Sequence, residues 1–266
     1  MIYNIIVFFW NLYLYLKNKF YFKLNYTKVR LYKRWKRSRE GYKLTFMDDF
    51  NTNEIKKYWR TDSYTGQRFD ENSLNEKHIE FYSDNCFDFN STTVMIQSKK
   101  LPKNLKIDNS VYHADVHIGQ LDSSLYFMQT EGYFEFRVKL PKANNIKSSI
   151  KLHSLLTGSE ISIIDYKGIN SNKKYSVGVN GNYMNVYTPF DLSSRFFIYA
   201  LKWDNRFLKF YFQDKLVKAI KKPKDIFHPM HIILKNGINS KSIDGVEFPN
   251  SFDIDYVRVY EEKENK

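Results

Sequence analysis

From Gly41 onward, apolar and polar residues alternate in short segments separated by turns rich in Asn, Asp, Ser and Gly. A period of two is typical of β-strands, because successive side chains point to opposite faces of the sheet. The clearest segment is Tyr133–Leu140, in which every second residue is apolar, and Pro141 ends it because proline has no amide hydrogen for the ladder. The same pattern predicts strands at Val94–Ser98, Ile150–Leu155, Tyr175–Val179, Tyr183–Tyr187, Phe197–Trp203, Phe207–Gln213, His231–Leu234 and Phe252–Tyr260.

The order of these segments predicts the fold class. No helical segments alternate with the strands, so the pattern favours two packed antiparallel sheets. The 266 residues are 42% hydrophobic and 18% aromatic, which is enough for a large core and favours strands. We therefore predict one all-β domain over residues 41–262, followed by a charged tail at 263–266. Flexible loops are expected at Leu101–Ser110 and Asn236–Val246.

The net charge of +13 is concentrated at the N-terminus. Residues 1–43 contain eleven Lys and Arg against one acidic residue, a balance of +10, so the rest of the chain carries only +3. The body is therefore nearly neutral. Because no nucleic-acid-binding module accompanies the basic residues, nucleic acid is not predicted as a partner.

Residues 1–40 form an arm that is apolar and aromatic up to Leu16 and strongly basic from Lys17. The apolar part is shorter than the roughly 20 residues needed to cross a bilayer. It also lacks the basic start and the small-residue cleavage site of a signal peptide. We expect a helical arm that associates with a membrane surface, on a side that the sequence does not indicate. The alternative is a helix packed on the body, with its Lys and Arg side chains solvated.

The run Glu160-Ile-Ser-Ile-Ile-Asp165 brings two carboxylates into one predicted strand. If one extra residue is bulged into this strand, Glu160, Ser162 and Asp165 all point to the same face. Two carboxylates on one face are the arrangement that a two-carboxylate active site requires. These three residues are therefore the candidate catalytic group.

Four blocks, found in the order of a known family, carry a resemblance. They are Leu44–Asn51, similar to F-x-D-E-F-N; Thr130–Pro141, similar to Y-G-R-F-E-x-R-x-K-L-P; Phe196–Trp203, similar to F-H-x-Y-x-x-x-W; and Phe252–Tyr260, similar to x-x-V-D-Y-V-R-V-Y. Over residues 42–261 the chain resembles the laminarinase-like branch of glycoside hydrolase family sixteen. This resemblance implies a concanavalin-A-like jelly-roll sandwich and no required cofactor.

The resemblance also implies a retaining mechanism on β-linked glucans or galactans, with the signature E-x-D-x-x-E on a bulged strand. Glu160 then stands at the nucleophile, Ser162 at the middle Asp, and Asp165 at the final Glu, the general acid and base. Because two of the three positions differ, the motif is degenerate, and hydrolysis of β-glycosidic bonds is expected to be weakened or altered. The alternative is a non-catalytic glycan-binding or scaffold protein in surface-polysaccharide assembly.

Substrate contacts are predicted from the segment just before this run. Where the family shows tryptophan platforms, this chain has Lys147, Lys151 and His153 on one predicted strand face. Ammonium groups favour carboxylate, sulfate or phosphate, so these residues predict binding of an anionic polysaccharide or oligosaccharide. The alternative is a solvated face neutralised by nearby carboxylates. Tyr64 and Arg68 lie in segments that line the cleft of family members and are further predicted binding residues.

A structural calcium ion is a further implication of the resemblance. Asp49 and Asp255 stand where many family members hold calcium, and oxygen ligands suit that ion. Plain surface carboxylates are the alternative. The single cysteine, Cys86, excludes an internal disulfide and a cysteine-based zinc site, and it is predicted to be buried.

Overall fold

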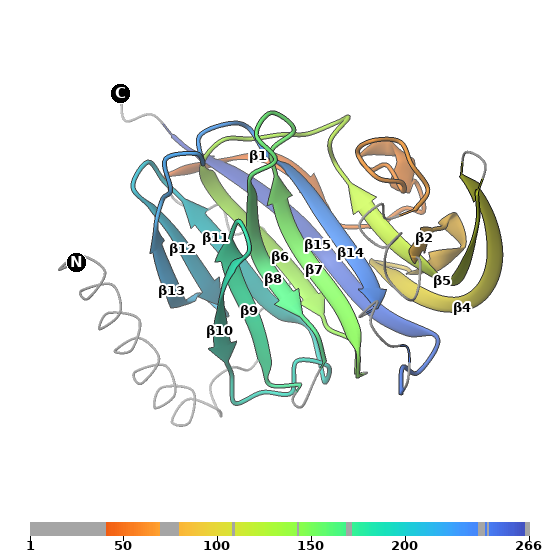
Figure 1. Cartoon of the computed structure of the whole chain (residues 1–266). Helices are drawn as coiled ribbons and strands as arrows, with labels where there is room; N and C mark the ends of the chain where they lie inside the picture. Colours follow the sequence, from red (N-terminus) through yellow and green to blue (C-terminus); the bar gives the residue numbers. More distant parts are fainter. Residues whose placement is uncertain are drawn as a thin grey trace.

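The computed structural model of the chain is shown in Figure 1. It describes residues 41–69, 80–107, 110–142, 144–168, 172–238, 243 and 245–263. The predicted arm at 1–40, with its expected helix, and residues 264–266 of the predicted tail lie outside the described residues. Among the described residues, no helix has the length and apolar character needed to cross a bilayer.

Strands make up most of the described chain. They are β1 (Tyr42–Asp48), β2 (Glu80–Tyr82), β3 (Phe87–Asn90), β4 (Thr93–Ile107), β5 (Ser110–Asp122), β6 (Gly132–Lys139), β7 (Ile146–His153), β8 (Glu160–Tyr166), β9 (Lys174–Val179), β10 (Asn182–Tyr187), β11 (Phe197–Trp203), β12 (Phe207–Phe212), β13 (Lys215–Lys221), β14 (His231–Ile238) and β15 (Asn250–Glu262). Within the described residues, short 3₁₀ turns occur at Ile55–Lys57 and Asp84–Cys86.

The strands form two layers that are continuous at one side. Hydrogen bonding follows the order β10-β9-β8-β7-β14-β5-β4-β15-β6-β11-β12-β13, with β1 added to β15, β2 to β5 and β3 to β4. Figure 1 shows β7 to β10 and β14 in front of β6, β11, β12, β13 and β15, with the curved β4–β5 pair at the side. The pairings are antiparallel apart from β2 with β5. The predicted all-β, two-sheet antiparallel sandwich is confirmed.

One hydrophobic core lies between the layers, and it follows from the alternation in the sequence. The apolar residues Ile150 and Leu152 of β7 and Phe134 and Phe136 of β6 have no exposed surface. They belong to a single cluster of apolar side chains drawn from both layers. Because each strand alternates, the outer face of the front layer is left to polar side chains.

Two predicted loops are in part strands. Residues 101–107 continue β4 and pair with β5, and Asn236–Ile238 continue β14 and pair with β7. Asn236 appeared to belong to a loop because it is polar, yet it is fully buried. Its amide donates to the carbonyl of Ile96 at 2.9 Å, and its Oδ1 accepts from Ser148 Oγ at 2.7 Å. These partners come from distant strands, so local composition could not indicate them.

Candidate functional site

Strand β8 contains the predicted bulge. On one side Ile164 pairs with Ile150 and Ser162 pairs with Lys151, so Ile163 is an extra residue without a partner in β7. Ile161, Ile163 and Ile164 all join the core and are at most 1% exposed. The side chains of Glu160, Ser162 and Asp165 therefore share the opposite face, as the sequence predicted. We call this outer face of the front layer the site face.

Strand β7 supplies the neighbours of these residues on the site face. His153 lies opposite Glu160, Lys151 opposite Ser162, and Ser149 opposite Asp165. Side chains directly opposite each other in an antiparallel pair share a face and lie close enough to interact. The predicted common face of Lys147, Lys151 and His153 is therefore confirmed as an arrangement, whereas their binding of substrate stays a prediction.

The carboxylate of Glu160 is held by three donors. Lys151 Nζ lies 2.7 Å from Oε2, Ser162 Oγ donates to Oε1 at 3.0 Å, and the Tyr183 hydroxyl donates to Oε1 at 3.3 Å. Burial raises the pKa of Glu160, but the charge of Lys151 and the hydrogen bonds from Lys151, Ser162 and Tyr183 outweigh it and leave the pKa below its ordinary value. Glu160 is therefore an ionised carboxylate at neutral pH.

Tyr183 reaches this carboxylate across a glycine. Lys151, Ser162, Gly178 and Tyr183 lie on one row across β7, β8, β9 and β10. Gly178 has no side chain to separate the Tyr183 ring from β8. A Cβ added at Gly178 would lie 2.3 Å from the carbonyl oxygen of Asn182, so this position in the β9–β10 hairpin requires glycine.

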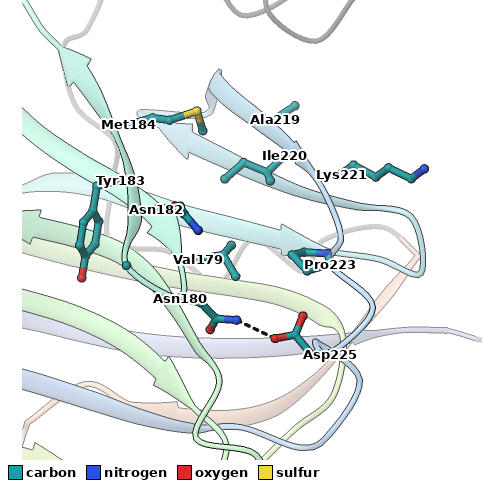
Figure 2. Close-up of a pocket in the computed structure, with 11 residues that line it drawn as sticks. Val179, Asn180, Asn182, Tyr183, Met184, Ala219, Ile220, Lys221, Pro223 and Asp225 are labelled. Carbon is teal, nitrogen blue, oxygen red and sulfur yellow. Dashed lines mark hydrogen bonds between the residues drawn. The ribbon is translucent and has the colours of Figure 1, made fainter. Parts of the chain in front are cut away.

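The backbone of Glu160 is held from the turn between β9 and β10. Asn180 Oδ1 accepts the Glu160 amide at 2.7 Å, and Asn180 Nδ2 donates to Asp225 Oδ2 at 2.6 Å. Figure 2 shows this pair at the edge of a pocket of about 700 Å³ between the β9–β10 hairpin and the segment from Ala219 to Asp225. Tyr183 belongs both to the lining of this pocket and to the site face. The position of Glu160 thus depends on the segment that follows β13.

Asp165 occupies a drier position than Glu160. It is only 4% exposed, and the Lys167 ammonium lies 3.9 Å from its Oδ2. Ser149 of β7 and Ser176 of β9 lie opposite it on the two neighbouring strands. Two small hydroxyl side chains therefore flank Asp165 on the site face.

A cluster of titratable groups adjoins Glu160 on the side of β14. The Tyr64 ring stacks on His153 with a centroid separation of 4.9 Å, and His153 contacts His231 edge to face at 5.2 Å. His231 Nε2 lies 3.6 Å from Asp122 Oδ1, and both side chains are fully buried. Burial raises the pKa of Asp122 to about 6 and lowers the pKa of His231 to about 4.

The other predicted site residues have different partners. Arg68 Nη1 lies 3.0 Å from Asp84 Oδ1 in an ion pair beside β2, and Lys147 is exposed at the start of β7. Of the predicted calcium ligands, Asp49 accepts from Arg258 Nη2 at 2.9 Å and Asp255 accepts from Arg137.

These partners bear on the calcium prediction. The described part of the chain has no group of three or more His, Cys, Asp or Glu that could hold a metal ion. Each predicted ligand is paired with an arginine side chain, so the described donors do not favour calcium. Calcium binding stays a prediction.

Sequence reasoning missed Tyr183, Asn180 and Asp225. The alternation predicted a strand at Tyr183–Tyr187 but gave no sign of which strand it pairs with. The signal for Asn180 is the Asn-Gly pair at 180–181 between two alternating segments, which is typical of a hairpin turn. Asp225 has no such local signal, because its contact with Asn180 spans 45 residues.

Comparison with known proteins agrees with this architecture. Endo-1,3-1,4-beta-glycanase ExsH of Rhizobium meliloti is 25% identical over 243 residues, covering 81% of this chain and 51% of the relative. The chain thus spans about half the length of the curated relatives that it matches.

Solved structures share the fold. The laminarinase catalytic domain of Thermotoga maritima has a TM-score of 0.70 at 19% identity and covers 84% of this chain and 99% of its own. The endo-beta-1,3-glucanase of Pyrococcus furiosus has a TM-score of 0.69 at 18% identity and covers 82% of this chain and 94% of its own. At these identities the likeness concerns the fold.

The family itself is indicated by a match to its sequence profile. The profile described as glycosyl hydrolases family 16 matches residues 73–256, which is more than half of the chain. That range contains the bulged strand β8 and most of both layers. The chain therefore belongs to glycosyl hydrolases family 16.

Proposed function

We propose that the site face binds a β-linked polysaccharide and cleaves it slowly by a retaining, endo-acting mechanism. The observation that carries this proposal is the bulge at Ile163, which brings Glu160, Ser162 and Asp165 to one face while Glu160 is held ionised. Retaining glycoside hydrolases use one ionised carboxylate as the nucleophile and a second carboxyl group as the general acid and base. The names of the curated relatives, endo-1,3-1,4-beta-glycanases, agree with this class of substrate.

In this mechanism the two carboxyl groups have distinct roles. An oxygen of Glu160 attacks the anomeric carbon, while the protonated carboxyl of Asp165 gives its proton to the departing glycosidic oxygen. The first product leaves, and the sugar remains as an ester of Glu160. Asp165 then takes a proton from a water molecule, whose oxygen attacks the anomeric carbon and releases Glu160 as a carboxylate.

The substitutions in the motif explain why slow turnover is proposed. Asp is one methylene shorter than Glu, so the carboxyl of Asp165 is withdrawn by about 1.5 Å from the position a glutamate would reach. Ser162 donates a hydrogen bond to Glu160 but carries no charge. A poorly placed general acid commonly costs about 10² to 10⁴ in rate.

An anionic glycan is proposed as the substrate class. Lys151 is already paired with Glu160 at 2.7 Å, so we assign the sugar anion to Lys147 and Lys167, two exposed lysines at the Asp165 end of the site face. Lys167 also lies 3.9 Å from Asp165 Oδ2, but its side chain is more than half exposed. Ammonium groups at that end of the site face would pair with carboxylate or sulfate groups on the glycan. Retardation by an anionic polysaccharide in affinity gels, reduced by Lys147→Gln, would support this class. Retardation by neutral β-glucans alone would contradict it.

One observation favours a second candidate, a glycan-binding protein without turnover. The Lys151 ammonium lies 2.7 Å from Glu160 Oε2, and an ion pair at this distance makes a carboxylate a weaker nucleophile. In that case the site face would hold a polysaccharide in surface-polysaccharide assembly and leave it intact.

Covalent labelling separates the two candidates. The full chain is incubated with a 2-deoxy-2-fluoro glycosyl fluoride, and peptide mass spectrometry locates the sugar ester. We expect the label on Glu160, with Glu160→Gln unlabelled and inactive in a reducing-end assay on laminarin and lichenan. Retention of polysaccharide by the wild-type chain, with no label and no reducing ends, would support the binding protein and contradict hydrolysis.

A further inference from the structure

One end of the sandwich carries an unusual number of exposed apolar side chains. Leu156 is 73% exposed, Leu125 is 68% exposed and Phe227 is 53% exposed, although each is large and apolar. They come from three connections, β7 to β8, β5 to β6 and β13 to β14. With their exposed neighbours they form what we call the loop rim, made of Leu125, Tyr126, Met128, Leu155, Leu156 and Phe227.

The three loops of the loop rim are bonded to one another. Gln129 and Met230 exchange backbone hydrogen bonds of 3.1 Å, which joins the β5–β6 and β13–β14 connections. Ser159 Oγ donates to Asp225 Oδ2 at 3.3 Å, which joins the β7–β8 connection to the same segment. These connections lie along the upper edge of the molecule in Figure 1. The exposed side chains therefore belong to one region of the surface.

Clustering distinguishes these residues from ordinary exposed apolar side chains. Among the described residues, thirteen large hydrophobic side chains are exposed, and six of them belong to this one end. Single exposed apolar residues are common, but a contiguous group marks a surface that contacts an apolar partner. The side chains stand on loops, a form suited to entering a soft apolar layer.

The N-terminal arm joins the domain at the same end. Tyr42, the first residue of β1, pairs with Glu262, and Thr45 Oγ1 donates to Gln129 Oε1 at 2.6 Å in the β5–β6 connection. The chain that precedes Tyr42 is apolar and aromatic up to Leu16 and basic thereafter, and residues 1–43 carry +10. That composition complements a bilayer with anionic headgroups. The arm is therefore attached at the end of the domain that carries the loop rim, and its composition indicates the same class of partner.

We propose that the loop rim docks this domain on a lipid bilayer that contains anionic phospholipid. Leucine, methionine, phenylalanine and tyrosine are the side chains that enter the boundary between headgroups and acyl chains. Glu160 directly follows the β7–β8 connection. Docking therefore orients the site face roughly perpendicular to the membrane, with Glu160 at the end nearest the lipid. Membrane docking by the loop rim is a separate function from glycan hydrolysis and does not depend on it.

A fluorescent reporter on the full chain tests the loop rim separately from the arm. Cys86 is the only cysteine and is buried, so a cysteine introduced on the surface can be labelled alone. An environment-sensitive nitrobenzoxadiazole dye is placed at Leu156→Cys, with Val111→Cys, which is also highly exposed, as the matched control. The probe is a vesicle of phosphatidylcholine and phosphatidylglycerol. We expect a blue shift, and quenching by spin-labelled lipid, at position 156 and not at 111.

Flotation supplies the second measurement. The triple variant Leu125→Ser, Leu156→Ser, Phe227→Ser is compared with Leu101→Ser, Val111→Ser, Tyr187→Ser, which removes exposed apolar side chains elsewhere. We expect the first variant to lose about ten-fold or more in partitioning onto the vesicles and the second to match wild type. Equal responses of the two reporters, or equal flotation of the two triple variants, would overturn the proposal. So would a loop rim that holds two chains together in sedimentation and leaves vesicles unbound.

Discussion

The ammonium group of Lys151 lies 2.7 Å from Oε2 of Glu160, the carboxylate that we propose as the nucleophile. Both side chains are about one fifth exposed, at 19% and 23%, so the pair is only partly screened by water. Lys151 lies opposite Ser162 in the ladder, the position where the resemblance to the family implies an aspartate. An ammonium group and an uncharged hydroxyl therefore lie next to Glu160, and together with Tyr183 they lower the pKa of Glu160.

Replacing Lys151 with methionine is expected to raise the pKa of Glu160. Burial raises that pKa, and Lys151 is the main group that lowers it, so its loss leaves only the hydrogen bonds from Ser162 and Tyr183 to oppose burial. The carboxylate then protonates at higher pH, and any acid limb of activity moves upward. The folded state also loses about 1.5–3 kcal/mol near neutral pH, because a charged hydrogen bond is removed from a partly buried acid.

Carbon NMR of labelled glutamate measures this pKa directly, without relying on turnover. Lys147→Met is the control, because it removes an exposed lysine from the same face of β7. A titration of Glu160 that is unchanged in Lys151→Met would contradict the ion pair as the cause of the lowered pKa.

Restoring the family's carboxylates is expected to increase hydrolysis. Asp165→Glu returns a methylene to the acid, and combined with Ser162→Asp it returns the charge, so a gain of about 10² or more in rate is expected on a good substrate. Initial rates on laminarin and lichenan are the measurement. Adding Glu160→Gln to the restored chain should abolish the gain. A restored chain that is no faster than wild type would show that more than the motif limits turnover.

Asn180 is expected to support Glu160 through its side chain. Its φ is 48°, in the left-handed region that asparagine tolerates, and its amide joins the Glu160 backbone to Asp225. Asn180→Ala loses both hydrogen bonds and strains the turn, so it should cost about 2–4 kcal/mol of unfolding free energy.

Asn180→Gly separates these effects because glycine adopts the same backbone without strain. It should recover the strain component in urea unfolding, while any loss of glycan cleavage remains. Equal stability of Asn180→Ala and wild type would contradict the role of this turn.

Asp122 should make stability depend on pH in a defined direction. Burial raises its pKa to about 6 in the folded state, above the ordinary value of 3.8. The contribution to stability is therefore full below about pH 4 and is lost as the pH rises through about 6. Asp122→Asn removes this titration, and asparagine Oδ1 can still accept the Ser124 amide.

The unfolding free energy of Asp122→Asn, relative to wild type, should therefore improve as the pH is raised from 4 to 7. Chemical unfolding at a series of pH values measures this difference. A difference that stays constant across this range would contradict a raised pKa at Asp122.

Alternation within single strands was enough to predict which residues share the site face. The alternation placed Lys151 beside His153 on one face of β7, and one bulged residue placed Glu160 with Asp165 on the same side of β8. Both follow from the period of two within single strands. For Lys151 the sequence left two interpretations open, a ligand for a sugar anion or a lysine neutralised by a nearby carboxylate. The pairing of β7 with β8 gives Lys151 a carboxylate partner inside the protein, as the second interpretation expects.

Other elements were missed because their signal is not local. Residues 101–107 lack clean alternation, yet they are a strand because β5 lies beside them. Tyr183 contacts Glu160 only because β9 places a glycine between their strands. Asp225 supports the site through a turn that lies 45 residues away in the chain.

Read alone, the amino-acid order was enough for the all-β class, the two-layer core, the bulge in β8 and the family, because each depends on alternation or on motifs within one segment. The partner of each charge on the site face, the role of Asn180 and the gathering of apolar loops at one end needed the folded chain. Strand order and register bring together residues that are far apart in sequence, and a contact energy depends on distances that no local pattern contains.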